Sequence, residues 1–136
     1  MTELAPFMDS IRIFLHVLAA TIWVGGQLVL AALVPVLRRR DPGMPKLAAQ
    51  QFNKVAWPAY WILVATGVWN VVALHSENKT HAWDVVLMIK VAVVALSGVA
   101  AFMHTRAKST KGLAIWGALT GLTALFALYL GVLLAG

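Results

Sequence analysis

Four long apolar stretches alternate with three short polar ones along this chain. The apolar stretches cover residues 11–37, 55–74, 85–103 and 113–135, and each is close to or longer than the ~20 residues that a membrane-spanning helix needs. Short connections favour antiparallel neighbours. The pattern therefore predicts an all-α, integral membrane four-helix bundle with up-down-up-down topology. We expect its helices over approximately residues 10–37, 47–75, 82–105 and 112–135.

The composition supports a membrane location. Of the 136 residues, 61% are hydrophobic and only 12% are charged, whereas soluble domains carry about 25% charged residues. The first apolar stretch is too long for a signal peptide and ends at three arginines, so we interpret it as a retained helix. The sequence thus predicts a single four-span transmembrane domain over residues 1–136, with the lipid bilayer as its surroundings.

The charge distribution predicts the orientation. The net charge is +6, and most basic residues lie between the first and second stretches or between the third and fourth. By the positive-inside rule, these two connections are cytoplasmic and both termini lie outside the cytoplasm, in a multi-pass protein of the cell membrane. The basic balance is therefore explained by topology. No stacking or groove-reading feature indicates a nucleic-acid partner, and the lack of cysteine excludes thiolate-bound iron–sulfur clusters.

Lys90 is the only charged residue within the third apolar stretch, residues 85–103. A charge at the centre of a spanning helix costs about 2.5–3.5 kcal/mol on insertion scales, so such a residue usually faces a partner, a ligand or a water-filled path. The alternative is that Lys90 snorkels to the outer surface with a structural role. Lys90, Ser97 and His104 follow at intervals of seven residues and are expected on one helix face.

The first stretch contains one ionisable residue away from its ends, His16. Trp23 and Gln27 are expected on the same helix face, and Gly26 is one of the small residues that line it. Small residues allow a neighbouring backbone or a flat ligand to come close. The alternative interpretation of His16 is a hydrogen bond to another helix.

Counting residues from the outer helix ends places three candidates at a similar depth. Lys90 lies seven residues, or ~10 Å, below Trp83. His16 lies about as far below the outer end of the first helix, and Thr66 and Gly67 of the second helix reach the same level. His16, Gly67 and Lys90 are therefore predicted to surround one flat cofactor. Haem is such a cofactor, and its iron accepts a neutral imidazole.

Several segments carry a resemblance to known families. Residues 14–18 (Phe-Leu-His-Val-Leu) and 22–26 (Ile-Trp-Val-Gly-Gly) resemble the first helix of the CopD-like copper-resistance membrane domain. Their histidine, tryptophan and glycine spacing is similar to that of HemJ-type protoporphyrinogen oxidases. Residues 51–54 and 65–67 are similar to the second CopD-like helix, and Trp83 with residues 87–91 resembles the third helix of both families.

The HemJ-type resemblance implies that His16 and Lys90 contact haem b, with two roles open to Lys90. It is either the second axial ligand of the iron, as a neutral amine, or a cation paired with a haem propionate. The leading hypothesis is a membrane haem b protein for electron transfer or haem-linked oxidoreduction, which implies a membrane or periplasmic redox partner. The expected metal ligand is His16, joined by Lys90 under the first of these two roles, and the other expected cofactor-binding residues are Trp23, Gly26 and Gly67.

Two other hypotheses are kept. The CopD-like resemblance implies copper transport or tolerance, and the candidate copper ligands are His75, His81, His16 and Met88. The third hypothesis is a non-catalytic accessory membrane subunit. In that case, the polar helix faces form contacts between helices or between the subunits of a homo-oligomer.

Overall fold

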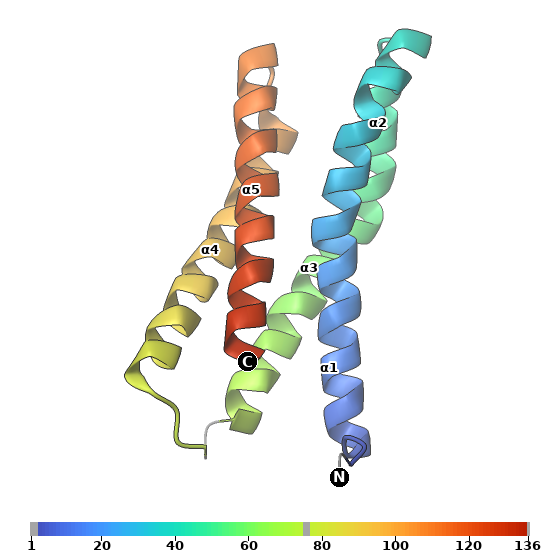
Figure 1. Cartoon of the computed structure of the whole chain (residues 1–136). Coiled ribbons are helices and arrows are strands. Elements are labelled where there is room, and N and C mark those ends of the chain that lie inside the picture. The colour runs from blue at the N-terminus through green and yellow to red at the C-terminus, as the bar shows by residue number, and fades with distance from the viewer. Residues whose placement is uncertain (1–2, 75–76, 136) are drawn as a thin grey trace. The chain divides into compact units, whose positions relative to one another are not determined.

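The computed structural model describes residues 3–74 and 77–135, and every regular element within them is helical (Figure 1). The elements are α1 (Phe7–Ala20), the π-helical turn η1 (Thr21–Gly25), α2 (Gly26–Arg40), α3 (Met44–Leu74), α4 (His81–Arg106) and α5 (Thr110–Ala135). Because α1, η1 and α2 are continuous, the described residues contain four helices long and apolar enough to cross a membrane. This confirms the predicted all-helical class with four long apolar helices.

The helices extend slightly beyond the predicted bounds, and polar side chains cap the starts of α4 and α5. The Thr80 hydroxyl accepts a hydrogen bond from the backbone N–H of Trp83 at 3.1 Å, which caps the start of α4. Ser109 accepts in the same way from the backbone N–H of Gly112 at 2.9 Å before α5. Residue 75, where the second helix was predicted to end, lies outside the described residues.

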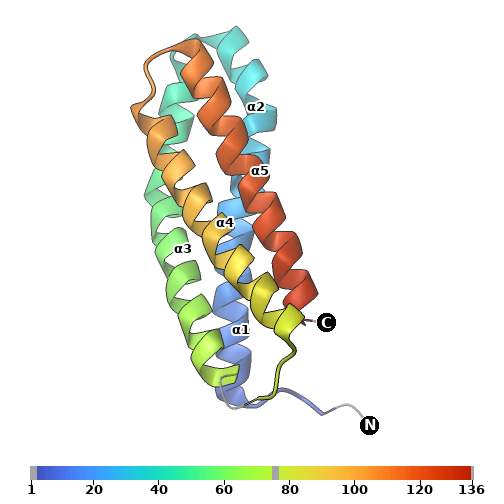
Figure 2. The same cartoon turned by 90° about the vertical axis from the view of Figure 1, so that its left-hand side faces the viewer.

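The chain divides into two compact units, Met1–Glu77 and Asn78–Gly136. In the first unit, the continuous helix α1–η1–α2 packs along α3 as a helical hairpin (Figure 1). In the second unit, α4 and α5 form another antiparallel hairpin, seen along its length in Figure 2. A tight turn joins the helices of the first hairpin, where the Asp41 carboxylate accepts a hydrogen bond from the backbone N–H of Gly43 at 2.8 Å.

Small residues bring the two helices of the first hairpin together. Ala19 of α1 and Ala59 of α3 are only 2% and 3% exposed, and they pack with Leu63. Small side chains at such a contact allow close approach of the two backbones. Further along, Gly26 lies under the ring of Phe52, where a β-carbon would overlap the ring.

One face of α4 contacts α5 at intervals of seven residues, and it includes Ser97 and His104, which the spacing had placed on one face. The indole Nε1 of Trp83 donates to the Leu134 carbonyl at 3.1 Å, and Nδ1 of His104 lies 2.9 Å from the Leu113 carbonyl. Seven residues before His104, the hydroxyl of buried Ser97 donates to the Thr120 carbonyl at 3.1 Å. The Thr120 hydroxyl donates to the Ser97 carbonyl at 2.9 Å. A 3.5-residue repeat of this kind keeps one helix face on its neighbour.

Candidate functional site

His16 lies on the face of α1 that packs against α3. Its Nδ1 atom lies 2.8 Å from the hydroxyl oxygen of Thr66, and Thr66 is 4% exposed. The hydrogen bond joins residues fifty positions apart in the sequence, so packing of the two helices creates it. Counting from the helix ends had placed His16 and Thr66 at one depth, and the hydrogen bond shows that they face each other.

The hydrogen bonds of Thr66 determine which nitrogen of His16 carries the proton. The Thr66 hydroxyl lies 2.7 Å from the Ile62 carbonyl and 3.2 Å from the Leu63 carbonyl. A carbonyl can only accept, and a hydroxyl has one proton to donate. Thr66 therefore donates to its own helix and accepts from Nδ1–H of His16. In the neutral imidazole the lone pair then lies on Nε2, which is the arrangement of a metal-binding histidine whose other nitrogen is held by a hydrogen bond.

Gly67 leaves space beside the His16 ring. A β-carbon on Gly67 would lie 3.7 Å from Cε1 of His16, which is ordinary van der Waals contact. The backbone of α3 therefore passes close to the imidazole, as predicted from the depth of Gly67. A side chain larger than alanine at this position would meet the ring.

Trp23 and Gly26, the other predicted pocket residues, lie further along the first hairpin. Trp23 is 4% exposed, and its ring centroid lies 4.7 Å from that of Tyr60 and 5.4 Å from that of Trp57. It belongs to an aromatic cluster between η1 and α3. The space beside Gly26 is filled by the Phe52 ring. The contribution of both residues to a cofactor pocket stays a prediction.

Lys90 lies on the face of α4 that packs on α5. A β-carbon on Gly131 would lie 3.1 Å from the ammonium nitrogen of Lys90. The other contacts between α4 and α5 fix how the two helices are paired. If this pairing is continued, the backbone of Lys90 lies opposite Ala127, which is one helical turn from Gly131. The amine therefore leans by roughly 6 Å toward the start of α4, the direction in which helical side chains point. Gly131 provides the space for it.

Arg12 is a buried charged residue that the sequence analysis did not single out. It is only 8% exposed, and its Nη1 atom lies 3.3 Å from a carboxylate oxygen of Asp9, whose side chain is 45% exposed. Its Nε atom is buried and has no hydrogen-bond partner among the described residues. Arg12 precedes His16 by four residues, and this spacing on one helix face was the available signal.

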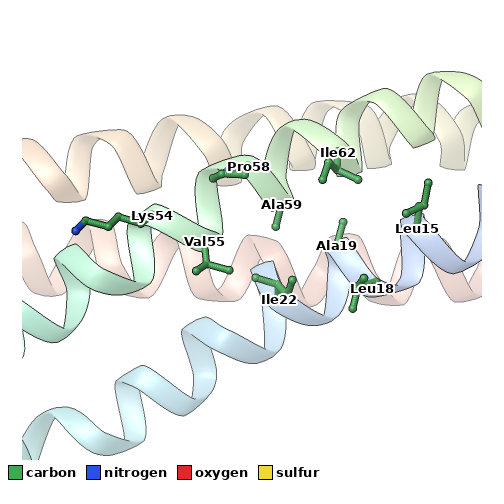
Figure 3. A pocket seen from close by; sticks show the side chains of 9 residues that line it. All are labelled: Leu15, Leu18, Ala19, Ile22, Lys54, Val55, Pro58, Ala59 and Ile62. Carbon is green, nitrogen blue, oxygen red and sulfur yellow. The ribbon is translucent and has the colours of Figure 1, made fainter.

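A shallow apolar groove of about 340 Å³ lies between the helices of the first hairpin (Figure 3). Leu15, Ala19 and Ile22 line it from one helix. Val55, Ala59 and Ile62 are among the residues that face them from α3, and Lys54 lies at one end. His16 and Gly67 are not among the lining residues. The groove is therefore distinct from the surroundings of the imidazole.

The candidate copper ligands are only partly described. His75 lies outside the described residues. His81 is exposed at the start of α4, and Met88 is 70% exposed. Within residues 3–74 and 77–135, no three histidine, cysteine or acidic side chains are grouped so that they could hold a metal ion.

Comparisons with known proteins were made for the whole chain. No family model, no curated protein and no solved structure matches it. The resemblance to the CopD-like and HemJ-type proteins therefore stays a prediction from the residues quoted for it.

Proposed function

We propose that this chain is an integral membrane haem b-binding protein that serves electron transfer or a haem-linked oxidation in the membrane. The observation that supports this most directly is the hydrogen bond from Nδ1–H of His16 to Thr66, at 2.8 Å. It orients the imidazole, and it directs the lone pair of Nε2 away from the α3 hydroxyl. An oriented neutral imidazole in an apolar helix is what haem iron requires of a proximal ligand.

The donor chemistry near His16 fits a haem better than a copper ion. Haem takes one or two axial ligands from the protein, because the porphyrin supplies the other four nitrogens. Protein copper sites draw on several histidine, cysteine or methionine ligands. Among its described residues, the first hairpin offers one oriented imidazole, a nearby glycine and apolar surroundings. When bound, the haem would supply one-electron chemistry, and the protein would orient its iron through His16 and limit access of water.

The remaining parts of the proposal follow from the sequence. The basic turns would lie in the cytoplasm and both termini outside. Lys90 would contribute either the second axial ligand or a cation for a propionate. Electrons would pass to or from a membrane or periplasmic redox partner. An enzymatic activity would then be that of a membrane oxidoreductase.

The test is the absorption spectrum of the detergent-purified protein, oxidised and then reduced with dithionite, with a pyridine haemochrome assay for stoichiometry. We expect a b-type spectrum with one haem per chain. His16→Ala should lose the haem, whereas the matched control His104→Ala should keep it, because His104 hydrogen-bonds within the second hairpin. Lys90→Ala should shift the spectrum, and the exposed Lys54→Ala should not.

Two results would overturn the proposal. One is a preparation that stays colourless after haem is supplied, and the other is a His16→Ala protein with unchanged haem content and spectrum. Metal analysis of the same colourless preparation would separate the copper hypothesis from the accessory-subunit hypothesis. Bound copper that depends on His16 and His81 would support the former.

A further inference from the structure

Arg12 has an unsatisfied hydrogen-bond donor in a buried position. Its side chain is 9% exposed and pairs with Asp9 through Nη1 at 3.3 Å. The Nε atom on the other edge of the guanidinium is buried and has no acceptor among the described residues. Arginine stays charged at all relevant pH values and presents a planar set of donors that matches a carboxylate. A buried guanidinium edge without an acceptor is therefore suited to an anionic ligand group.

The position of Arg12 relates it to His16. The two residues are four positions apart on α1 and therefore share a helix face. Arg12 lies about 6 Å nearer the start of the helix, since each residue adds 1.5 Å along the axis. Its long side chain extends further in that direction, because helical side chains point toward the N-terminus. A flat ligand held at its centre by His16 would thus have one edge toward Arg12.

We propose that Arg12 binds a propionate carboxylate of the haem held by His16, through the Nε edge that Asp9 does not use. This inference rests on the proposed haem function and adds to it the group that fixes the rotational orientation of the porphyrin. Asp9 holds the opposite edge of the guanidinium and thereby positions it. Asp9 is half-exposed, so water and salt screen its charge. It therefore repels the propionate carboxylate less than a buried aspartate would.

The experiment compares two porphyrins that differ only in their two propionate groups. The purified protein is freed of haem and titrated with haem b and with haem b dimethyl ester, in which both propionates are esterified. Binding is followed by the absorption change on axial ligation. The variants are Arg12→Gln, Arg12→Lys and Asp9→Asn, and the exposed Arg38→Gln serves as control.

The wild type and Arg38→Gln should bind haem b about tenfold or more tightly than the ester, as expected for charge-assisted bonds to a carboxylate. In Arg12→Gln this preference should fall several-fold relative to the wild type, while binding of the ester stays close to wild type. Arg12→Lys keeps the charge but lacks the Nε edge, so it should keep only part of the preference. It also provides the test if Arg12→Gln does not fold. Asp9→Asn should keep the preference.

The outcomes separate the two proposals. If the wild type binds neither porphyrin, the haem function fails and this inference fails with it. If haem b binds through His16 but the preference over the ester is the same in the wild type and in the Arg12 variants, only this inference is overturned. Arg12 would then be a structural partner of Asp9.

Discussion

The substitution Thr66→Val tests the central element of the proposed site, because it removes the hydroxyl and nearly keeps the volume. Thr66 is 4% exposed, so water does not readily replace the lost acceptor for Nδ1–H of His16. Hydrogen bonds between membrane helices contribute about 0.6 kcal/mol on average and up to about 1.7 kcal/mol. At 2.8 Å the His16–Thr66 bond is short, and we expect a stability loss in the upper half of that range.

The effect on haem binding should exceed the effect on stability. Loss of the group that orients a metal-binding histidine typically reduces metal affinity by about 10- to 100-fold. The bond also makes the imidazole a better electron donor to iron. Its removal should therefore raise the reduction potential of the haem, because the ferric state gains more from electron donation. Thr66→Ser keeps the hydroxyl and should behave like the wild type in both respects.

Haem affinity is measured by titration of the haem-free protein, and the potential by spectroelectrochemical titration of the loaded protein. Unfolding by denaturant in the same detergent gives the stability change. The reasoning is refuted if Thr66→Val matches Thr66→Ser in haem affinity and in potential. A loss of stability with unchanged haem properties would show that the bond only packs the hairpin.

Three further predictions concern the hairpins and the topology. Gly26→Leu should destabilise the first hairpin by about 1–3 kcal/mol, the usual cost of overpacking, and Phe52→Ala should relieve part of this loss in a thermal unfolding assay; an additive double variant would contradict the contact. In the second hairpin, Ser97→Ala and Thr120→Val should each lower the free energy of unfolding by about 0.5–1.5 kcal/mol. The double variant should lose less than the sum of the two single losses, because each hydroxyl hydrogen-bonds to the other residue. Compartment reporters fused to either terminus should report the outer side, and a reporter inserted at residues 41–43 should report the cytoplasm; termini on opposite sides would disprove the orientation.

The helices could be predicted from the sequence, because their signals are strong and local. Long apolar runs separated by turn residues specify four helices, and residues 3–74 and 77–135 form four long apolar helices. The exact ends depend on caps. Thr80, for example, accepts from Trp83 and starts α4 one residue before the predicted bound. Such a cap is visible in the sequence only after the helix start is known.

The shared helix face of these α4 residues was also predictable. Ser97 and His104 recur at intervals of seven, and a repeat of 3.5 residues keeps positions on one side of a helix. Both side chains contact α5. The π-helical turn η1 was not predictable from hydropathy, because one extra residue in a turn leaves the apolar pattern almost unchanged. Its effect is to rotate the helix after Thr21–Gly25 relative to α1.

Arg12 lies near a helix end, and arginines are usually exposed, so its residue type and position alone do not single it out. Burial of an end residue depends on how the chain folds back over it, and no local pattern encodes that. Its relation to His16, four residues later, is local and could have been used. The depth of His16 and Thr66 was likewise available from counting, whereas their hydrogen bond depends on the rotation of both helices about their axes.

The protonation of His16 is fixed by its hydrogen bonds, whereas the role of Lys90 depends on a flexible side chain. Variants at the His16 site should therefore be tested first. The protonated nitrogen of His16 follows from a proton count within one hairpin: the Thr66 hydroxyl donates to Ile62, so it can only accept from the imidazole. The role of Lys90 depends on where a flexible side chain with four methylene groups places its amine, which leans toward Gly131. A ligand can redirect such a chain at little cost, whereas it cannot change the proton count at Thr66. Thr66→Val therefore examines the more constrained step, and variants of Lys90 become interpretable once His16 is known to hold the iron.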